Sequence, residues 1–217
     1  MKLVIVLFAI MIWASSGLSQ SVINTEKLFK DNNEGLAFAA ELTGSALAGN
    51  AQVFIVEFSL NTAYKKNKNQ LLLLSGGEFI KEEQDLISNT LYGQVRYEYQ
   101  IHDKGKLFAF YQLQRNEILL ILRRQLLGVG YKHSLVNVQE DSLSKFKIDV
   151  SLGAMQEEEL LDEKQLNSEE IAYTNYTRGI SSLVVVWNPT SNFSVINTTY
   201  FQSYLKNVSD FRVLNEK

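Results

Sequence analysis

Histidine and cysteine are the residues most often used for nucleophilic or metal chemistry, and this chain has few of them. It contains two histidines, His102 and His133, and no cysteine. The lack of cysteine excludes a disulfide scaffold, thiolate metal sites and a cysteine nucleophile. Neither histidine has a second ligand at helical or hairpin spacing, and no G-x-S-x-G elbow occurs. We therefore predict no catalytic residue, no metal site and no cofactor, and we place both histidines at the surface or rim.

Carboxylates are the second group of side chains that could bind a ligand. The stretch EEELLDEKQLNSEE, residues 157–170, is acidic, does not alternate, and is predicted to be the longest loop. Oxygen ligands of this kind can bind divalent cations. The carboxylates considered are Glu157, Glu158, Glu159, Asp162, Glu163, Glu169 and Glu170. Because no EF-hand spacing is present and charge runs are usually solvated, we expect a solvated loop rather than a specific site.

Most of the remaining chain alternates between apolar and polar residues. In ISNTLYGQVRYEYQI, residues 87–101, the odd-numbered residues are mostly apolar and the even-numbered residues are mostly polar. The stretches around 107–114 and 146–154 repeat this pattern. A period of two is typical of a β-strand with one apolar and one polar face. The runs are also about as long as a tilted membrane-spanning strand, roughly 9–11 residues.

One segment allows two interpretations. NEILLILRRQLLG, residues 116–128, could form a helix, whereas Gly128 and Gly130 followed by further alternation favour a strand. We prefer the strand. Adjacent arginines must then point to opposite faces, so we place Arg124 on the polar face and Arg123 at the rim.

The polar faces of the predicted strands form the candidate site. Its predicted lumen-facing members are Arg96, Glu98, Gln112, Gln114, Arg124, Asp149 and Glu157. In a soluble sandwich these side chains would be the solvated exterior, whereas in a membrane barrel they would be enclosed. The apolar face carries tyrosines that we place near strand ends, which is typical of a bilayer interface; they are Tyr97, Tyr99, Tyr111 and Tyr131. We expect the enclosed charges to pair with one another, because a barrel of about ten strands is marginal for permeation.

The chain begins with features of an exported protein. Lys2, an apolar run from Leu3 to Ala14 and small residues before Gln20 predict a signal peptide over residues 1–19. Residues 20–217 then form a single β-barrel domain. The formal net charge is −3, and no basic stripe is present, so we expect no nucleic-acid partner. Short polar turns after the second, fourth and eighth predicted strands, with the acidic loop after the seventh, are typical of outer-membrane barrels.

Several short motifs, in order along the chain, resemble the salt-induced outer-membrane-protein family, also called domain of unknown function 481 (DUF481). They are VRYEY (95–99), FYQLQRN (110–116), RRQLLGVGYK (123–132), LGAMQEEE (152–159), TNYT (174–177) and YFQSYLKNVSDFR (200–212). The resemblance implies an all-β, antiparallel up-and-down barrel in the Gram-negative outer membrane, with no assigned biochemical role and no defined catalytic residues. It also implies contact with outer-membrane lipid and with the barrel-assembly machinery.

The resemblance leaves the number of strands open. Family members continue past the DFR motif with further strands and end on an aromatic residue, whereas this chain stops at DFRVLNEK. The alternation gives nine strands and the start of a tenth, and single-chain bacterial barrels have even strand numbers. Either the chain is a fragment that lacks closing strands, or the strand count differs.

We therefore expect a monomeric outer-membrane β-barrel with a structural or envelope-adaptation role, or a narrow passive pore. Two alternatives stay open. The first is a membrane-embedded enzyme that acts on lipids through His102 or His133. The second is a soluble periplasmic β-barrel that carries a small apolar ligand.

Overall fold

The computed structural model consists of one antiparallel β-sheet. It describes residues 34–49, 52–83, 85–139, 145–163, 166, 171–190 and 193–216. The predicted signal peptide, residues 1–19, lies outside the described residues. Within the described ranges, no helix is both long enough and apolar enough to cross a membrane.

The sheet has ten strands, and each strand pairs with the next one along the chain. The strands are β1 (Gly35–Leu47), β2 (Val53–Lys66), β3 (Asn69–Glu82), β4 (Asp85–His102), β5 (Gly105–Asn116), β6 (Ile121–Gln139), β7 (Lys145–Leu161), β8 (Tyr173–Thr190), β9 (Phe193–Tyr204) and β10 (Asn207–Glu216). The predicted all-β, up-and-down arrangement of ten antiparallel strands is confirmed. The sheet is not closed into a barrel, because β1 pairs only with β2 and β10 only with β9 among the described strands.

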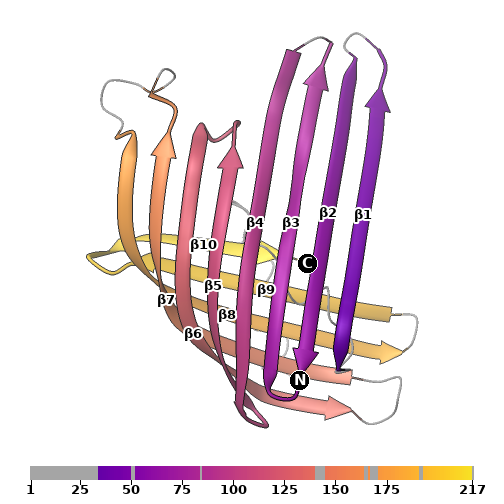
Figure 1. Cartoon of the computed structure of the whole chain (residues 1–217), viewed down its shortest axis with the longest axis vertical. Coiled ribbons are helices and arrows are strands. Elements are labelled where there is room, and N and C mark those ends of the chain that lie inside the picture. Colours follow the sequence, from indigo (N-terminus) through magenta and orange to yellow (C-terminus); the bar gives the residue numbers. More distant parts are fainter. Residues whose placement is uncertain are drawn as a thin grey trace, which may run out of the picture.

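The sheet is strongly coiled. In Figure 1, β1 to β4 run side by side along the long axis of the molecule, while β9 and β10 cross behind them in another direction. The right-handed twist of neighbouring strands accumulates into such a shape. The coil gives the sheet a concave face and a convex face, and only the concave face can bury side chains.

The two faces differ sharply in polarity. Gln112 and Arg124 are each 2% exposed, whereas Val95 is 46% and Leu107 48% exposed. The register explains how one face extends over several strands: Leu107 pairs with Tyr131, and Tyr131 with Leu152. Polar side chains therefore dominate the buried concave face, and apolar side chains cover the exposed convex face.

A glycine-lined bend lies in the middle of the sheet. Phe108 pairs with Gly130, and Phe110 pairs with Gly128, so both rings lie on β6 where it has no side chain. Gly130 in turn pairs with Gly153 of β7. Glycine inside a strand allows such a close approach. The two glycines of β6 thus make room for the aromatic rings on the concave face.

The structure selects between the two interpretations of residues 116–128. Ile121 begins a strand of 19 residues, so the helical interpretation is wrong. Arg124 is buried on the concave face, and Arg123 is exposed.

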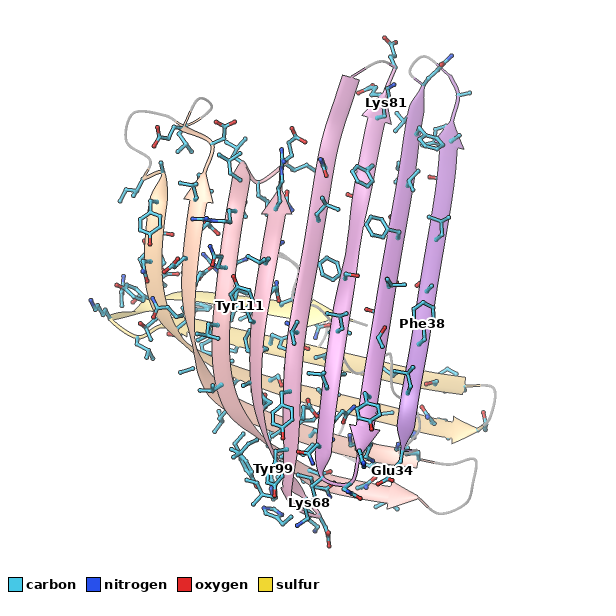
Figure 2. All side chains as sticks on the ribbon, viewed as in Figure 1. Glu34, Phe38, Lys68, Lys81, Tyr99 and Tyr111 are labelled. Carbon is cyan, nitrogen blue, oxygen red and sulfur yellow. The ribbon has the colours of Figure 1, made fainter. Side chains whose placement is uncertain are left out.

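Three details of the sequence interpretation need correction. Residues 157–161 belong to β7 rather than to the predicted acidic loop, and Glu169 and Glu170 of that loop lie outside the described residues. Glutamates occur on both faces there, which hides the alternation. Tyr111 lies in the middle of β5, as Figure 2 shows, and Tyr131 lies in the middle of β6, so neither is near a strand end. Two-residue connections follow β3 and β9 as well as β2, β4 and β8, so connection length does not by itself distinguish the two ends of the sheet.

Candidate functional site: a buried ionic network

Glu157 of β7 is the centre of the most buried group of charges. Its side chain is 1% exposed and contacts the guanidinium groups of Arg124 and Arg178. A third guanidinium, that of Arg212, places Nη1 2.9 Å from the Glu157 Oε1. Arg212 belongs to β10, which is three strands away from β7 in the sheet. The coiling of the sheet therefore brings together side chains that a flat sheet would keep apart.

Two further carboxylates complete this group. Arg178 Nη1 lies 3.3 Å from Asp210 Oδ1, and Arg124 Nε lies 3.5 Å from Glu159 Oε2. The six side chains, which we call the arginine network, are Arg124, Glu157, Glu159, Arg178, Asp210 and Arg212. Three cations thus face three anions. Buried charges are costly unless they are paired, and this balance supplies the pairing.

A second set of ion pairs lies nearer the turns that follow β2 and β4. Glu98 Oε1 accepts from Arg96 Nε at 2.8 Å, and Glu98 Oε2 lies 3.3 Å from Lys106 Nζ. The Arg96 guanidinium carbon also lies 4.2 Å from the centre of the Phe108 ring. This cation–π geometry orients Arg96 along the concave face.

A third set is centred on a carboxylate of β7. Asp149 Oδ2 lies 3.3 Å from Lys132 Nζ and 2.6 Å from Lys147 Nζ. The Asp149 side chain is 3% exposed. Each buried carboxylate of the concave face thus has at least one cationic partner.

Amide side chains fill the space between the charged groups. Gln94 Nε2 donates to Gln112 Oε1 at 2.9 Å. The amide of Gln114 is buried, and neither of its polar atoms has a hydrogen-bond partner among the described residues. The adjoining cavity, between β4–β6 and β7–β9, has a volume of only about 70 Å³. The concave face of the central strands is therefore largely filled by its own side chains.

A larger space lies beside the first three strands. It has a volume of about 460 Å³, and Glu41, Glu57 and Glu78 line it. Glu57 pairs directly with Glu78 in the register. Within the described residues, no group of three or more histidine, aspartate or glutamate side chains has a geometry suited to a metal ion.

The predicted site residues are placed as follows. Six are buried on the concave face, and these are Glu98, Gln112, Gln114, Arg124, Asp149 and Glu157. Arg96 is partly buried, with 15% of its side chain exposed. The charged ones belong to three separate ionic groups, while Gln112 bonds Gln94 and Gln114 lies between the charged groups. Their assignment to a lumen stays a prediction, because the sheet is open.

Sequence reasoning missed several partners of these residues. The missed partners are Lys106, Lys132, Lys147, Arg178, Asp210 and Arg212. Each of the three lysines is an even number of residues away from a predicted polar residue of its own strand and so lies on the same face. The alternation could therefore have identified them. Arg212 carries no comparable signal, because its approach to Glu157 depends on the curvature of the sheet.

Comparison with known proteins assigns the chain to a family. A family model described as a protein of unknown function, DUF481, matches residues 40–216. The chain belongs to the DUF481 family. No curated protein and no solved structure matches it. The predicted DUF481 membership is confirmed, while the link to salt-induced outer-membrane proteins stays a prediction.

Proposed function

We propose that this DUF481 protein is a Gram-negative outer-membrane β-barrel with a structural or envelope-adaptation role. The observation that carries the proposal is the reversal of the polarity usual for soluble proteins. Ion pairs and amides are buried on the concave face, while apolar side chains are exposed on the convex face. This pattern is typical of a barrel that faces lipid on the outside.

The exposed apolar surface extends over the whole sheet. Each of the ten strands carries a large apolar side chain that is more than a third exposed; one example per strand, in order, is Leu36, Phe54, Leu73, Val95, Leu107, Leu127, Leu152, Trp187, Phe201 and Phe211. Soluble proteins rarely expose a continuous apolar surface of this size. A soluble carrier of an apolar ligand would instead bury these residues around the ligand, so we favour the membrane.

The two free edges require closure in a membrane. Backbone groups of an open sheet edge would be unsatisfied in hydrocarbon. Ten is an even number, so β1 and β10 run antiparallel and could pair. We propose that they pair with each other in the outer membrane, after the barrel-assembly machinery has inserted the monomeric chain.

The packing of the concave face favours a structural role over a wide channel. The arginine network and the paired lysines occupy the wall formed by β4 to β10, and the adjoining cavity is small. The space beside β1 to β3 supports a second candidate function, a narrow passive pore. Since Glu41, Glu57 and Glu78 line that space, such a pore would prefer cations. Conductance of the purified protein in planar bilayers distinguishes these two roles.

Localisation tests the main proposal. We expect the full chain, expressed in a Gram-negative host, to be recovered in the outer-membrane fraction and to need detergent for extraction. Its gel mobility should change on heating, as is usual for folded outer-membrane barrels. Recovery as a soluble monomer without detergent would contradict the proposal and support the carrier. A lipid-hydrolysing activity lost on substitution of His102 or His133 would instead support the enzyme.

A further inference from the structure

The two histidines, far apart in sequence, lie together at one end of the sheet. His102, the last residue of β4, pairs with Gly105 of β5, and Gly105 pairs with His133 of β6. A register shift between Gln100 and His102 interrupts the alternation of β4 at this point. Such bulges re-aim side chains and are frequent next to functional sites. Tyr131, two residues before His133, lies on the same face.

The glycine in the middle of this row makes the approach possible. A Cβ atom at Gly105 would overlap with the imidazole Nε2 of His102 and the hydroxyl of Tyr131. The rings from β4 and β6 therefore close over β5 at a position where no other residue would leave room. We call His102, Tyr131 and His133 the histidine–tyrosine cluster.

Two imidazole nitrogens converge on one phenol oxygen in this cluster. His102 Nε2 lies 3.1 Å from the Tyr131 hydroxyl, and His133 Nδ1 lies 3.0 Å from the same atom. The centres of the two imidazole rings are 6.0 Å apart. Neighbouring ligands with metal–ligand bonds of about 2.0–2.1 Å are separated by roughly 2.9 Å in a square-planar site and roughly 3.3 Å in a tetrahedral one. The phenol oxygen thus already lies at about this spacing from each imidazole nitrogen.

We propose that the histidine–tyrosine cluster binds a divalent transition-metal ion, with Cu²⁺ bound most tightly. Imidazole and phenolate are nitrogen and oxygen donors, and Cu²⁺ has the highest affinity for such ligands among the divalent first-row metals. On binding, Tyr131 releases its hydroxyl proton to solvent. The ring proton of His102 moves to Nδ1, and the 3.3 Å contact from the Lys104 N–H is given up. The site does not depend on the proposed function, because it is built by two hairpins alone.

A chain of hydrogen bonds is the competing account of the same geometry. The Lys104 N–H would donate to His102, His102 to Tyr131, and Tyr131 to His133. That arrangement satisfies these three donors without a metal. The two accounts differ in whether the cluster takes up an ion stoichiometrically.

Copper titration of the full chain, produced without a polyhistidine tag, distinguishes metal binding from the hydrogen-bond chain. The chain has two histidines and no cysteine, so no other imidazole and no thiolate competes for the copper. We expect one Cu²⁺ per chain, and loss of this binding in both His102→Gln and His133→Gln. Tyr131→Phe should abolish the phenolate-to-copper charge-transfer absorption. Tyr111→Phe is the matched control, because it removes a phenol of the same face that bonds Gln125 at 2.9 Å, and it should keep the absorption.

The titration has clear contrary outcomes. Wild-type protein that takes up no stoichiometric copper would overturn the proposal, as would equal uptake by the double variant His102→Gln/His133→Gln. Gly105→Ala keeps all three ligands but fills the space between them, and it should weaken copper binding. The β-sheet signal in far-ultraviolet circular dichroism checks that each variant is folded.

Discussion

Glu157 shows how one residue can organise a buried face. Three guanidinium groups from three different strands converge on its carboxylate, which is almost completely enclosed. Removing one partner of a buried pair leaves the other charges uncompensated. The carboxylate therefore matters more for the stability of the wall than any single arginine around it.

Glu157→Gln should destabilise the folded protein by about 3–5 kcal/mol, the range for breaking a buried pair. The measurement is urea unfolding in lipid vesicles. Glu158→Gln is the matched control, because Glu158 is the adjacent residue of β7 and lies outside the arginine network, with a 3.4 Å contact to Asn175. It should change the unfolding free energy by less than roughly 0.5 kcal/mol. Equal effects of the two substitutions would show that the network does not stabilise the fold.

Single apolar residues of the convex face provide a second test at this scale. Val95→Lys should cost about 2–4 kcal/mol if position 95 lies near the bilayer midplane. Ile101→Lys, near the end of the same strand, should cost only about 0–1 kcal/mol. The two positions are similarly exposed, at 46% and 43%, so a soluble protein would tolerate both equally. The amount of heat-modifiable protein in outer membranes reports the difference.

At the scale of elements, the bend across β5, β6 and β7 depends on glycine. Phe108 and Phe110 of β5 occupy the space above Gly130 and Gly128 of β6. Side chains at both glycines would push the rings into the concave face, where the ion pairs lie. The packing of β5 on β6 is thus linked to the curvature that assembles the arginine network.

Gly130→Ala should destabilise the protein by about 1–3 kcal/mol, the usual cost of overpacking. The added Cβ would lie 2.6 Å from the Leu152 carbonyl oxygen and overlap with the Phe108 ring. Gly93→Ala is the control, since a Cβ there meets nothing within 4 Å. It should be neutral or stabilise by up to roughly 1 kcal/mol. A neutral Gly130→Ala would rule out the proposed role of the bend.

Most strands could be predicted from the sequence because local alternation decides them. The faces of β4, β5 and β6 follow from a period of two, and the same rule places Arg124 on the buried face once the two glycines of β6 favour a strand. The end of β7 could not be predicted in this way. Glutamates on both faces from Glu157 to Glu159 remove the contrast between apolar and polar that marks a strand.

The pairings within the candidate site were beyond sequence reasoning for a different physical reason. Arg212 meets Glu157, and His102 meets His133, only because the sheet coils or because a bulge shifts one residue. Neither feature can be recognised from the order of apolar and polar residue types along one strand. Curvature and register are set by many strands together, so a single stretch of sequence does not contain them.

At the scale of the whole molecule, the open edges of β1 and β10 are the main feature to test. The chain has no native cysteine, so introduced pairs report only their own contact. Leu42→Cys in β1, combined in turn with Phe211→Cys, Val213→Cys or Asn215→Cys in β10, samples three registers. We expect one pair to form an efficient disulfide within a single chain in outer membranes.

Crosslinks between chains would instead indicate that a second copy covers the edges. Leu42→Cys combined with Leu107→Cys, which lies on the distant strand β5, is the negative control and should not crosslink. Absence of any crosslink from the three β10 positions would contradict closure by β1 and β10.

The most direct test of the central claim, that the convex face meets lipid, uses a fluorescent label on Val95→Cys in vesicles with brominated acyl chains. A label on Asp103→Cys, in the exposed turn after β4, is the reference. Bromine atoms quench only nearby fluorophores, so we predict strong quenching at position 95 and weak quenching at position 103. A label at position 95 that brominated lipid quenches no more than the turn label, and that aqueous iodide quenches instead, would contradict the account.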